Sequence, residues 1–176
     1  RVLGLAERAT SVMGRFGCGA TLREQLNIVR PVYGLLKGEP TDEPLRGMHW
    51  RSRDGAPETP VDPRQSDTGF FWTSPVLSND GQSAREVTDL ITPIYHAHGF
   101  DPLITFTMIT ERAMIAVTNM AFDRRVAEEV AAAEACYEQL TTTLIEAGYI
   151  PYRSAPRGYA KLRQPGSTFW ELATQL

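Results

Sequence analysis

Two amphipathic helical segments alternate with apolar, β-branched runs between residues 69 and 153, and this alternation restricts the fold more than any other feature. The first segment opens on a capping box at Ser83–Glu86, and apolar residues then recur at i, i+3, i+4 and i+7 from Val87. The second segment keeps a 4-3 apolar spacing along one face and is followed by Gly148, which favours helix termination. The sequence therefore predicts helices over 83–98 and 124–147.

Short apolar segments around these helices predict strands. Residues 70–74 are rich in aromatic side chains, and the runs 103–108 and 114–122 are apolar and β-branched. Polar residues 110–112 join the last two runs, which is typical of a hairpin. With a short final strand at 149–153, the order becomes β-α-β-β-α-β. We therefore expect an α+β fold with a ferredoxin-like antiparallel sheet and both helices on one face.

The N-terminal part of the chain is less regular. A second capping box at Thr21–Glu24 predicts a helix that is bent or interrupted at Pro31. Residues 39–68 form a long connection rich in Pro, Asp, Arg and Gly, with a short strand expected at 46–51. The clustered glycines of residues 14–19 match no phosphate-binding spacing and follow no apolar strand, so they predict a turn.

Composition excludes several classes of protein. The chain carries 18 Lys and Arg against 21 Asp and Glu, so a strongly basic nucleic-acid binder is excluded. No apolar run reaches the roughly 20 residues that cross a bilayer. Cys18 and Cys136 lie far apart, and His96 and His98 lack the i, i+4 spacing of a helical zinc pair, so we expect no metal. We expect a soluble protein, with the cytoplasm slightly favoured over the periplasm.

Three groups of residues are candidates for a site. Thr105 and Asn119 interrupt apolar strands, so they either line a pocket or face water. The consecutive aromatics at 70–72 fill a core or form a pocket wall, and composition favours the core. Tyr152 and Arg153 place a phenol beside a guanidinium, which suits recognition of an anionic oxygen. The alternative for this pair is an exposed strand end.

Several short segments resemble the vanillyl-alcohol oxidase and para-cresol methylhydroxylase flavoproteins. Their order and spacing carry the resemblance, which covers the chain from about Thr21 onward. The segments are Leu36–Thr41, Gly69–Pro75 (GFFWTSP), His98–Asp101 with the following Phe106-Thr107, Phe122–Arg124 and Gly148–Arg153.

The resemblance implies part of a larger enzyme. Residues 21–155 would form its substrate or cap domain, residues 1–20 the tail of an upstream FAD-binding domain, and residues 156–176 the start of a C-terminal helical segment. The fragment alone is not expected to be active, because a separate domain of the same protein would hold the FAD. A homodimer is also implied. The electron acceptor stays open between oxygen, for an oxidase, and cytochrome c, for a dehydrogenase.

The family reaction is oxidation of a para-substituted phenol. The substrate binds as phenolate and loses a hydride from its benzylic carbon to the flavin, which leaves a quinone methide. By resemblance, Tyr152 and Arg153 are the catalytic residues that hold the phenolate oxygen, and Arg153 also approaches the flavin. Asn119 stands where the hydroxylase branch has an acidic residue, and an amide cannot act as that base. The residues at substrate-binding positions are Trp72, Pro102, Thr105, Val117 and Asn119.

Many members of this family bond FAD covalently through a His or a Tyr of this domain. Phe70 occupies the place of that His, and no Tyr lies between Tyr33 and Tyr95. We therefore expect non-covalent FAD, with Phe70 packed near the ring edge. The alternative to the enzyme is a non-catalytic ferredoxin-like binding or dimerisation module, because this fold serves many functions.

Overall fold

The computed structural model describes residues 33–35, 37–42, 45, 47–59, 61–62, 64–155, 158–163 and 166–173. The chain separates into two compact units, Arg1–Gly47 with Ala56–Pro60, and Met48–Gly55 with Val61–Leu176. The helix expected from Thr21, the glycine turn and Cys18 lie outside the described residues. A 3-10 helix, η1 (Gly47–His49), stands within the segment 46–51, so the strand expected there is wrong. The sheet and its helices lie in the second unit.

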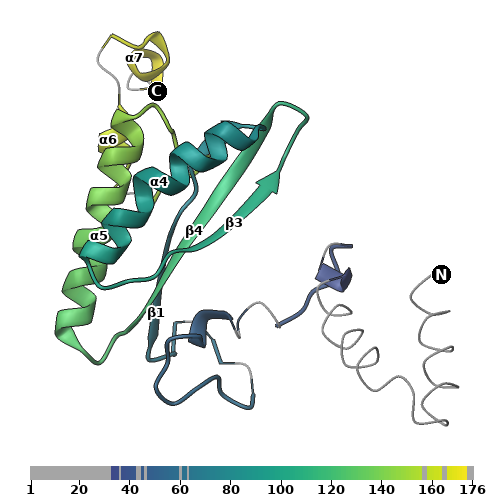
Figure 1. Ribbon diagram of the computed structural model, residues 1–176, viewed down its shortest axis with the longest axis vertical. Helices are drawn as coiled ribbons and strands as arrows, with labels where there is room; N and C mark the ends of the chain where they lie inside the picture. The colour runs from purple at the N-terminus through teal and green to yellow at the C-terminus, as the bar shows by residue number, and fades with distance from the viewer. Residues whose placement is uncertain are drawn as a thin grey trace, which may run out of the picture. The chain divides into compact units, whose positions relative to one another are not determined.

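The sheet is antiparallel and has four strands, with β4 at its centre (Figure 1). Strands β1 (Thr68–Thr73) and β2 (Val76–Ser78) pair with successive parts of β4 (Ala113–Asp123). Strand β3 (Leu103–Met108) pairs with the other edge of β4. Strands β1 and β3 are therefore parallel, with β4 inserted between them, which is the split βαβ arrangement. The α+β antiparallel prediction is confirmed.

The strand expected at 149–153 is reduced to a single bridge between Pro75 and Pro151. Two backbone bonds flank it, from Val76 N to Ile150 O (2.9 Å) and from Tyr152 N to Ser74 O (3.1 Å). Proline has no N–H group, so the two facing prolines cannot extend the ladder. The segment still lies against the outer edge of the sheet, at the junction between β1 and β2.

Both long helices begin at a different residue from the one expected. Helix α4 (Gly81–Ala97) is capped by Asp80, whose Oδ1 accepts a bond from Ser83 N (2.8 Å). Ser83 is therefore the third residue of the helix rather than its cap. Helix α5 (Ala127–Glu146) begins three residues late, because the Asp123 carboxylate accepts from Arg125 N (2.9 Å) and holds a turn there.

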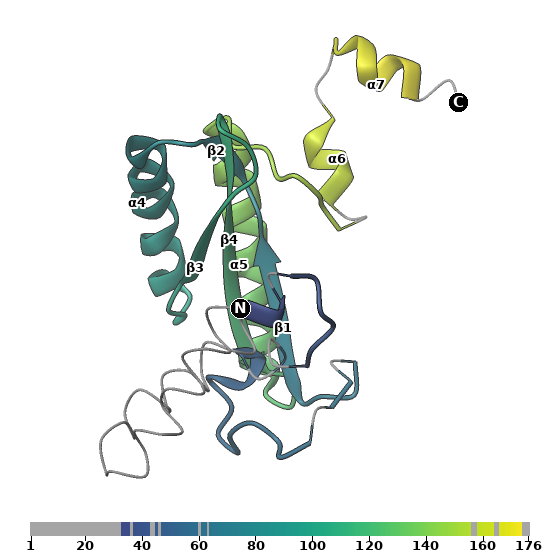
Figure 2. The ribbon, with the colours of Figure 1, turned by 90° about the vertical axis from the view of Figure 1, so that its right-hand side faces the viewer.

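The core lies between one face of the sheet and helices α4 and α5, which run side by side (Figures 1 and 2). Alternate residues of β4, from Met114 to Phe122, point into it. Inside it, Thr118 Oγ1 bonds both Tyr95 OH and Thr73 Oγ1, each at 2.8 Å. Burial raises the pKa of the Tyr95 phenol. Hydrogen bonds between these three hydroxyls therefore link α4, β4 and β1 inside the core.

The opposite side chains of the strands form a second surface, called the open face. None of these side chains belongs to the buried core cluster, and Trp72 and Leu103 are each 43% exposed. Along the middle of the sheet the register places on this face Phe70, Trp72, Val76, Leu103, Thr105, Thr107, Ile115, Val117, Asn119 and Ala121. Thr68, Ser78, Ala113 and Asp123 lie on the same face at the strand ends.

Two short helices follow, α6 (Tyr159–Leu162) and α7 (Thr168–Ala173). Lys161 fastens α6 to α5, since its Nζ donates to Thr142 Oγ1 (3.0 Å) and forms an ion pair with Glu138. Among the described residues, no helix is both long enough and apolar enough to cross a membrane.

The shared hydroxyl bonds of Thr118 lead to a stability prediction. Thr118→Val keeps the side-chain volume but leaves the Tyr95 and Thr73 hydroxyls buried without this partner, so we expect a loss of about 2–4 kcal/mol of unfolding free energy. Tyr95→Phe removes one hydroxyl together with its bond and should cost only about 1 kcal/mol. Urea unfolding followed by circular dichroism measures both values. Equal losses for the two variants would contradict the central position of Thr118.

Candidate functional site

The predicted substrate residues lie together on the open face. In the β-ladder Trp72 pairs with Asn119, and Asn119 pairs with Leu103, so the three form one row across the sheet. Thr105 and Val117 pair in the next row. Asn119 Nδ2 donates a long hydrogen bond, 3.5 Å, to Leu103 O, which keeps the amide at the surface of the sheet. Pro102, half-buried, directly precedes β3.

Arg153 comes to the open face from the sheet edge. The bond from Tyr152 N to Ser74 O fixes the backbone beside β1. The Arg153 guanidinium then lies over two rings, 5.5 Å from the centroid of Trp72 and 5.2 Å from that of Tyr152. A guanidinium over aromatic faces is stabilised by the ring quadrupoles. Trp72 and Arg153 are thereby brought together, and Tyr152 remains 49% exposed beside them.

Arg153 also borders two adjoining hollows between β1, α5 and the segment after residue 149. Arg153, Trp72, Tyr137 and Ser154 line both of them. Phe70 joins the wall of one, while Asn119 and Tyr152 line neither. The site therefore has an apolar wall with one positive charge at its rim.

The charge of Arg153 is not neutralised by an acid. Among the described residues it makes no ion pair, in contrast to Arg125, which pairs with three aspartates. A guanidinium is permanently charged and presents a planar fork of donors. Its position on the indole leaves those donors available for an anionic oxygen.

Two residues near Arg153 were missed by the sequence analysis. Tyr137 lies on the buried side of α5, and the 4-3 apolar spacing of this helix cannot show that one side of the ring borders a hollow. Ser74 Oγ is buried and finds no hydrogen-bond partner in the part of the chain that the structure describes. Ser74 was visible only as the Ser of the Ser-Pro segment that carries the resemblance.

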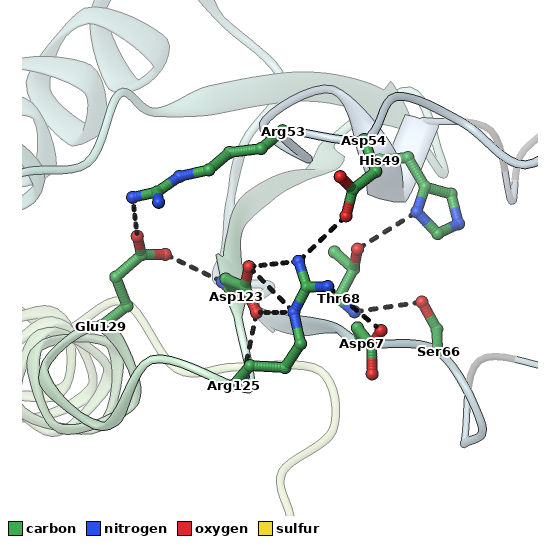
Figure 3. A network of polar contacts seen from close by, with 9 residues as sticks. All are labelled: His49, Arg53, Asp54, Ser66, Asp67, Thr68, Asp123, Arg125 and Glu129. Carbon is green, nitrogen blue, oxygen red and sulfur yellow. Dashed lines mark hydrogen bonds and ion pairs between the residues drawn. The ribbon is translucent and has the colours of Figure 1, made fainter.

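A second cluster of polar residues lies where β1 begins and β4 ends (Figure 3). Arg125 pairs with Asp123 (2.7 Å), Asp54 (3.0 Å) and Asp67 (3.5 Å). Glu129 accepts from Asp123 N (2.8 Å) and pairs with Arg53 at 3.9 Å. Because these charges compensate each other, the cluster fastens the loop 48–55 to the sheet rather than offering a charge to a ligand.

The contacts within this cluster also shift the pKa values of its residues. Hydrogen bonds from the Arg125 side chain and backbone lower the pKa of Asp123 to about 2. The side-chain bonds from Arg125 to Asp123 and Asp54 raise the pKa of Arg125. His49 joins through a contact of 3.1 Å between its Nδ1 and Thr68 Oγ1. No group of three or more His, Cys, Asp or Glu side chains in the described ranges could hold a metal ion. Burial raises the pKa of the free Cys136 thiol to about 11, so it stays protonated.

Comparison with known proteins gives two sequence relatives. The chain is 28% identical over 132 residues to 1'-carboxy-chondrochloren decarboxylase of Chondromyces crocatus, which covers 75% of this chain. It is 27% identical over 96 residues, 54% of the chain, to the flavoprotein subunit of 4-cresol dehydrogenase (hydroxylating) of Pseudomonas putida. The chain resembles the vanillyl-alcohol oxidase and para-cresol methylhydroxylase flavoproteins. The resemblance expected from the sequence is thus confirmed.

The chain spans 24% and 18% of the length of these two relatives. No family model matches it. Two solved structures are similar. One is p-cresol methylhydroxylase with substrate bound, at 28% identity and a TM-score of 0.46, covering 48% of this chain and 16% of that one. The other is 4-ethylphenol oxidase from Gulosibacter chungangensis, at 24% identity and a TM-score of 0.47, covering 51% and 17%.

The lowered pKa of Asp123 leads to a pH prediction. A carboxylate whose folded pKa lies below its unfolded value of 3.8 stabilises the fold above that value, and loses this contribution as the pH falls toward about 2. Asp123→Asn should therefore melt below the wild type at pH 7, with the difference shrinking between pH 4 and 2. Thermal unfolding at a series of pH values measures this. A difference that stays constant down to pH 2 would contradict the assigned ion pair.

Proposed function

We propose that this chain is the substrate, or cap, domain of an FAD-dependent oxidoreductase that oxidises para-substituted phenols. The observation that carries the proposal is the Arg153 guanidinium, which has no ion-pair partner in the described chain and lies 5.5 Å above the Trp72 ring, beside an apolar face. A phenolate combines a flat apolar ring with one anionic oxygen, so it matches both features. The name of the cresol dehydrogenase relative is consistent with such a substrate.

The residues around Arg153 fit one edge of a flavin. Its permanent charge suits the electron-rich pyrimidine edge, and the half-buried Phe70, 6.0 Å from Trp72, supplies a flat apolar neighbour. Arg153 and Phe70 would hold the ring from this side, while a separate domain of the same protein holds the phosphates. When bound, FAD accepts a hydride from the benzylic carbon of the substrate.

Arg153 and Tyr152 act on the substrate through its oxygen. A positive charge beside a phenol lowers the phenol's pKa, so the guanidinium favours the phenolate form. The ionised oxygen pushes electron density toward the para carbon, which eases hydride loss and leaves a quinone methide. Apolar neighbours such as Leu103 and Val117 pack against the substrate and exclude water. This strengthens the interaction between the guanidinium and the oxygen. A homodimer, and cytochrome c as one candidate electron acceptor, belong to the same proposal.

Arg153→Lys tests the anion site. Lysine keeps the charge but lacks the planar fork and stacks less well on Trp72, so flavin reduction by a 4-alkylphenol should slow about 10–100-fold, that is about 1.4–2.7 kcal/mol of barrier. Anaerobic stopped-flow absorbance measures the rate in the protein that carries this chain. Arg112→Lys, in the exposed hairpin turn, is the matched control and should keep the rate. A wild-type rate in Arg153→Lys would overturn the assignment.

The position of Phe70 predicts how FAD is held. A phenyl ring has no lone pair with which to bond the flavin, and in the sequence His49 is the only nucleophilic ring between Tyr33 and Tyr95. After acid precipitation of the FAD-loaded protein, the yellow colour should therefore stay in the supernatant. A yellow pellet, with the mass of flavin on a peptide from this chain, would contradict the prediction.

A further inference from the structure

Ser74 carries a buried hydroxyl that bonds nothing in the described part of the chain. The residue is 2% exposed, and its Oγ has no hydrogen-bond partner there. A hydroxyl buried in this way lowers the stability of the fold, because it gives up its bonds to water and forms none in return. A ligand that supplies the missing partner would account for such a group.

The register places the Ser74 side chain on the open face. Strands β1 and β2 pair with β4 at the same offset, so Ser74, which lies between them, stands beside Val117. Side chains alternate along a strand, and Ser74 follows Trp72 on the same face. Across the sheet edge, the bond from Tyr152 N to Ser74 O makes Tyr152 the opposite residue, and opposite residues of an antiparallel pair share a face.

The neighbours of Ser74 on this face are larger than serine and leave its hydroxyl without a partner. Trp72 precedes it and Val76 follows it, while Val117 and Tyr152 stand on its two sides. Valines offer only carbon, and Trp72 and Tyr152 carry their polar atoms on large rings that are 43% and 49% exposed. The hydroxyl is therefore enclosed by side chains that extend past it toward solvent.

Arg153 shares two of these neighbours with Ser74. Its guanidinium lies 5.5 Å from the Trp72 centroid and 5.2 Å from that of Tyr152. Residues two apart on a strand, such as Trp72 and Ser74, are about 7 Å apart, and two donors that bond one oxygen stand on the order of 5 Å apart. Arg153 and Tyr152 are both exposed, so their side chains can turn toward a ligand without disturbing the core.

We propose that Ser74 is a further substrate-binding residue, whose Oγ donates a hydrogen bond to the same phenolate oxygen that Arg153 attracts. The inference rests on the proposed function. A phenolate oxygen can accept several hydrogen bonds, so a hydroxyl and a guanidinium can bond it together. The ligand then supplies the partner that Ser74 Oγ lacks in the free chain, and the donated bond stabilises the ionised form of the phenol.

Ser74→Ala separates a ligand-binding role from a structural one. Removal of an unbonded hydroxyl should leave the urea midpoint of unfolding unchanged or raise it, whereas the affinity of the FAD-loaded protein for 4-cyanophenol should fall about 10–100-fold. Circular dichroism gives the midpoint, and calorimetric titration gives the affinity. Ser78→Ala, an exposed serine on the same face of β2, is the matched control and should change neither.

Each other result of this experiment decides against the inference. Equal affinity in the wild type and in Ser74→Ala would overturn it and leave the proposed function standing. A lower urea midpoint in Ser74→Ala would also overturn it, because the hydroxyl would then be bonded within the free protein. A wild type that fails to bind 4-cyanophenol would overturn the proposed function as well.

The pKa of bound 4-cyanophenol gives an independent readout. A hydroxyl that donates to the phenolate favours ionisation, so the bound pKa should rise in Ser74→Ala toward that of the free phenol. The rise should be smaller than in Arg153→Ala, which removes a full charge. Ultraviolet titration of the bound phenol measures both. An unchanged or lower bound pKa in Ser74→Ala would overturn the inference, because Ser74 would then not donate to the phenolate.

Discussion

The register of β4 is the constraint on which the rest of the structure depends. This strand pairs along both edges, and its even-numbered residues from Met114 to Phe122 enter the core. A shift of one residue would exchange the two faces, burying Asn119 and exposing Thr118. The hydroxyl bonds from Thr118 to Tyr95 and Thr73 exist only in the observed register. The packing of the core therefore also decides which residues meet on the open face.

Much of the fold could be predicted because its signals are local. The strand at 103–108 is found within its predicted bounds, and the apolar stripe from Val87 faces the core. The errors come from interactions that periodicity cannot show. Asp80 rather than Ser83 caps α4, and the facing Pro75 and Pro151 restrict the last strand to one bridge. Similarly, the substrate positions on β1, β3 and β4 share a face by alternation, whereas the hollow beside Tyr137 depends on tertiary packing.

Two arginines of the chain differ in whether acidic side chains compensate their charge. Arg125 is surrounded by Asp54, Asp67 and Asp123, so its charge is used to hold a loop against the sheet (Figure 3). Arg153 rests instead on the rings of Trp72 and Tyr152. Aromatic faces hold a guanidinium in place without neutralising it. The charge of Arg153 therefore remains available to an anionic ligand beside the apolar open face.

The most direct test of this account is the pKa of a phenol bound at Arg153. A phenolic inhibitor such as 4-cyanophenol changes its ultraviolet absorbance on ionisation, so its titration can be followed while it is bound to the FAD-loaded protein. We expect the pKa of the bound phenol to lie below that of the free phenol, and we expect this lowering to be lost in Arg153→Ala. The same bound pKa in the wild type and in this variant would contradict the central claim that Arg153 holds the phenolate.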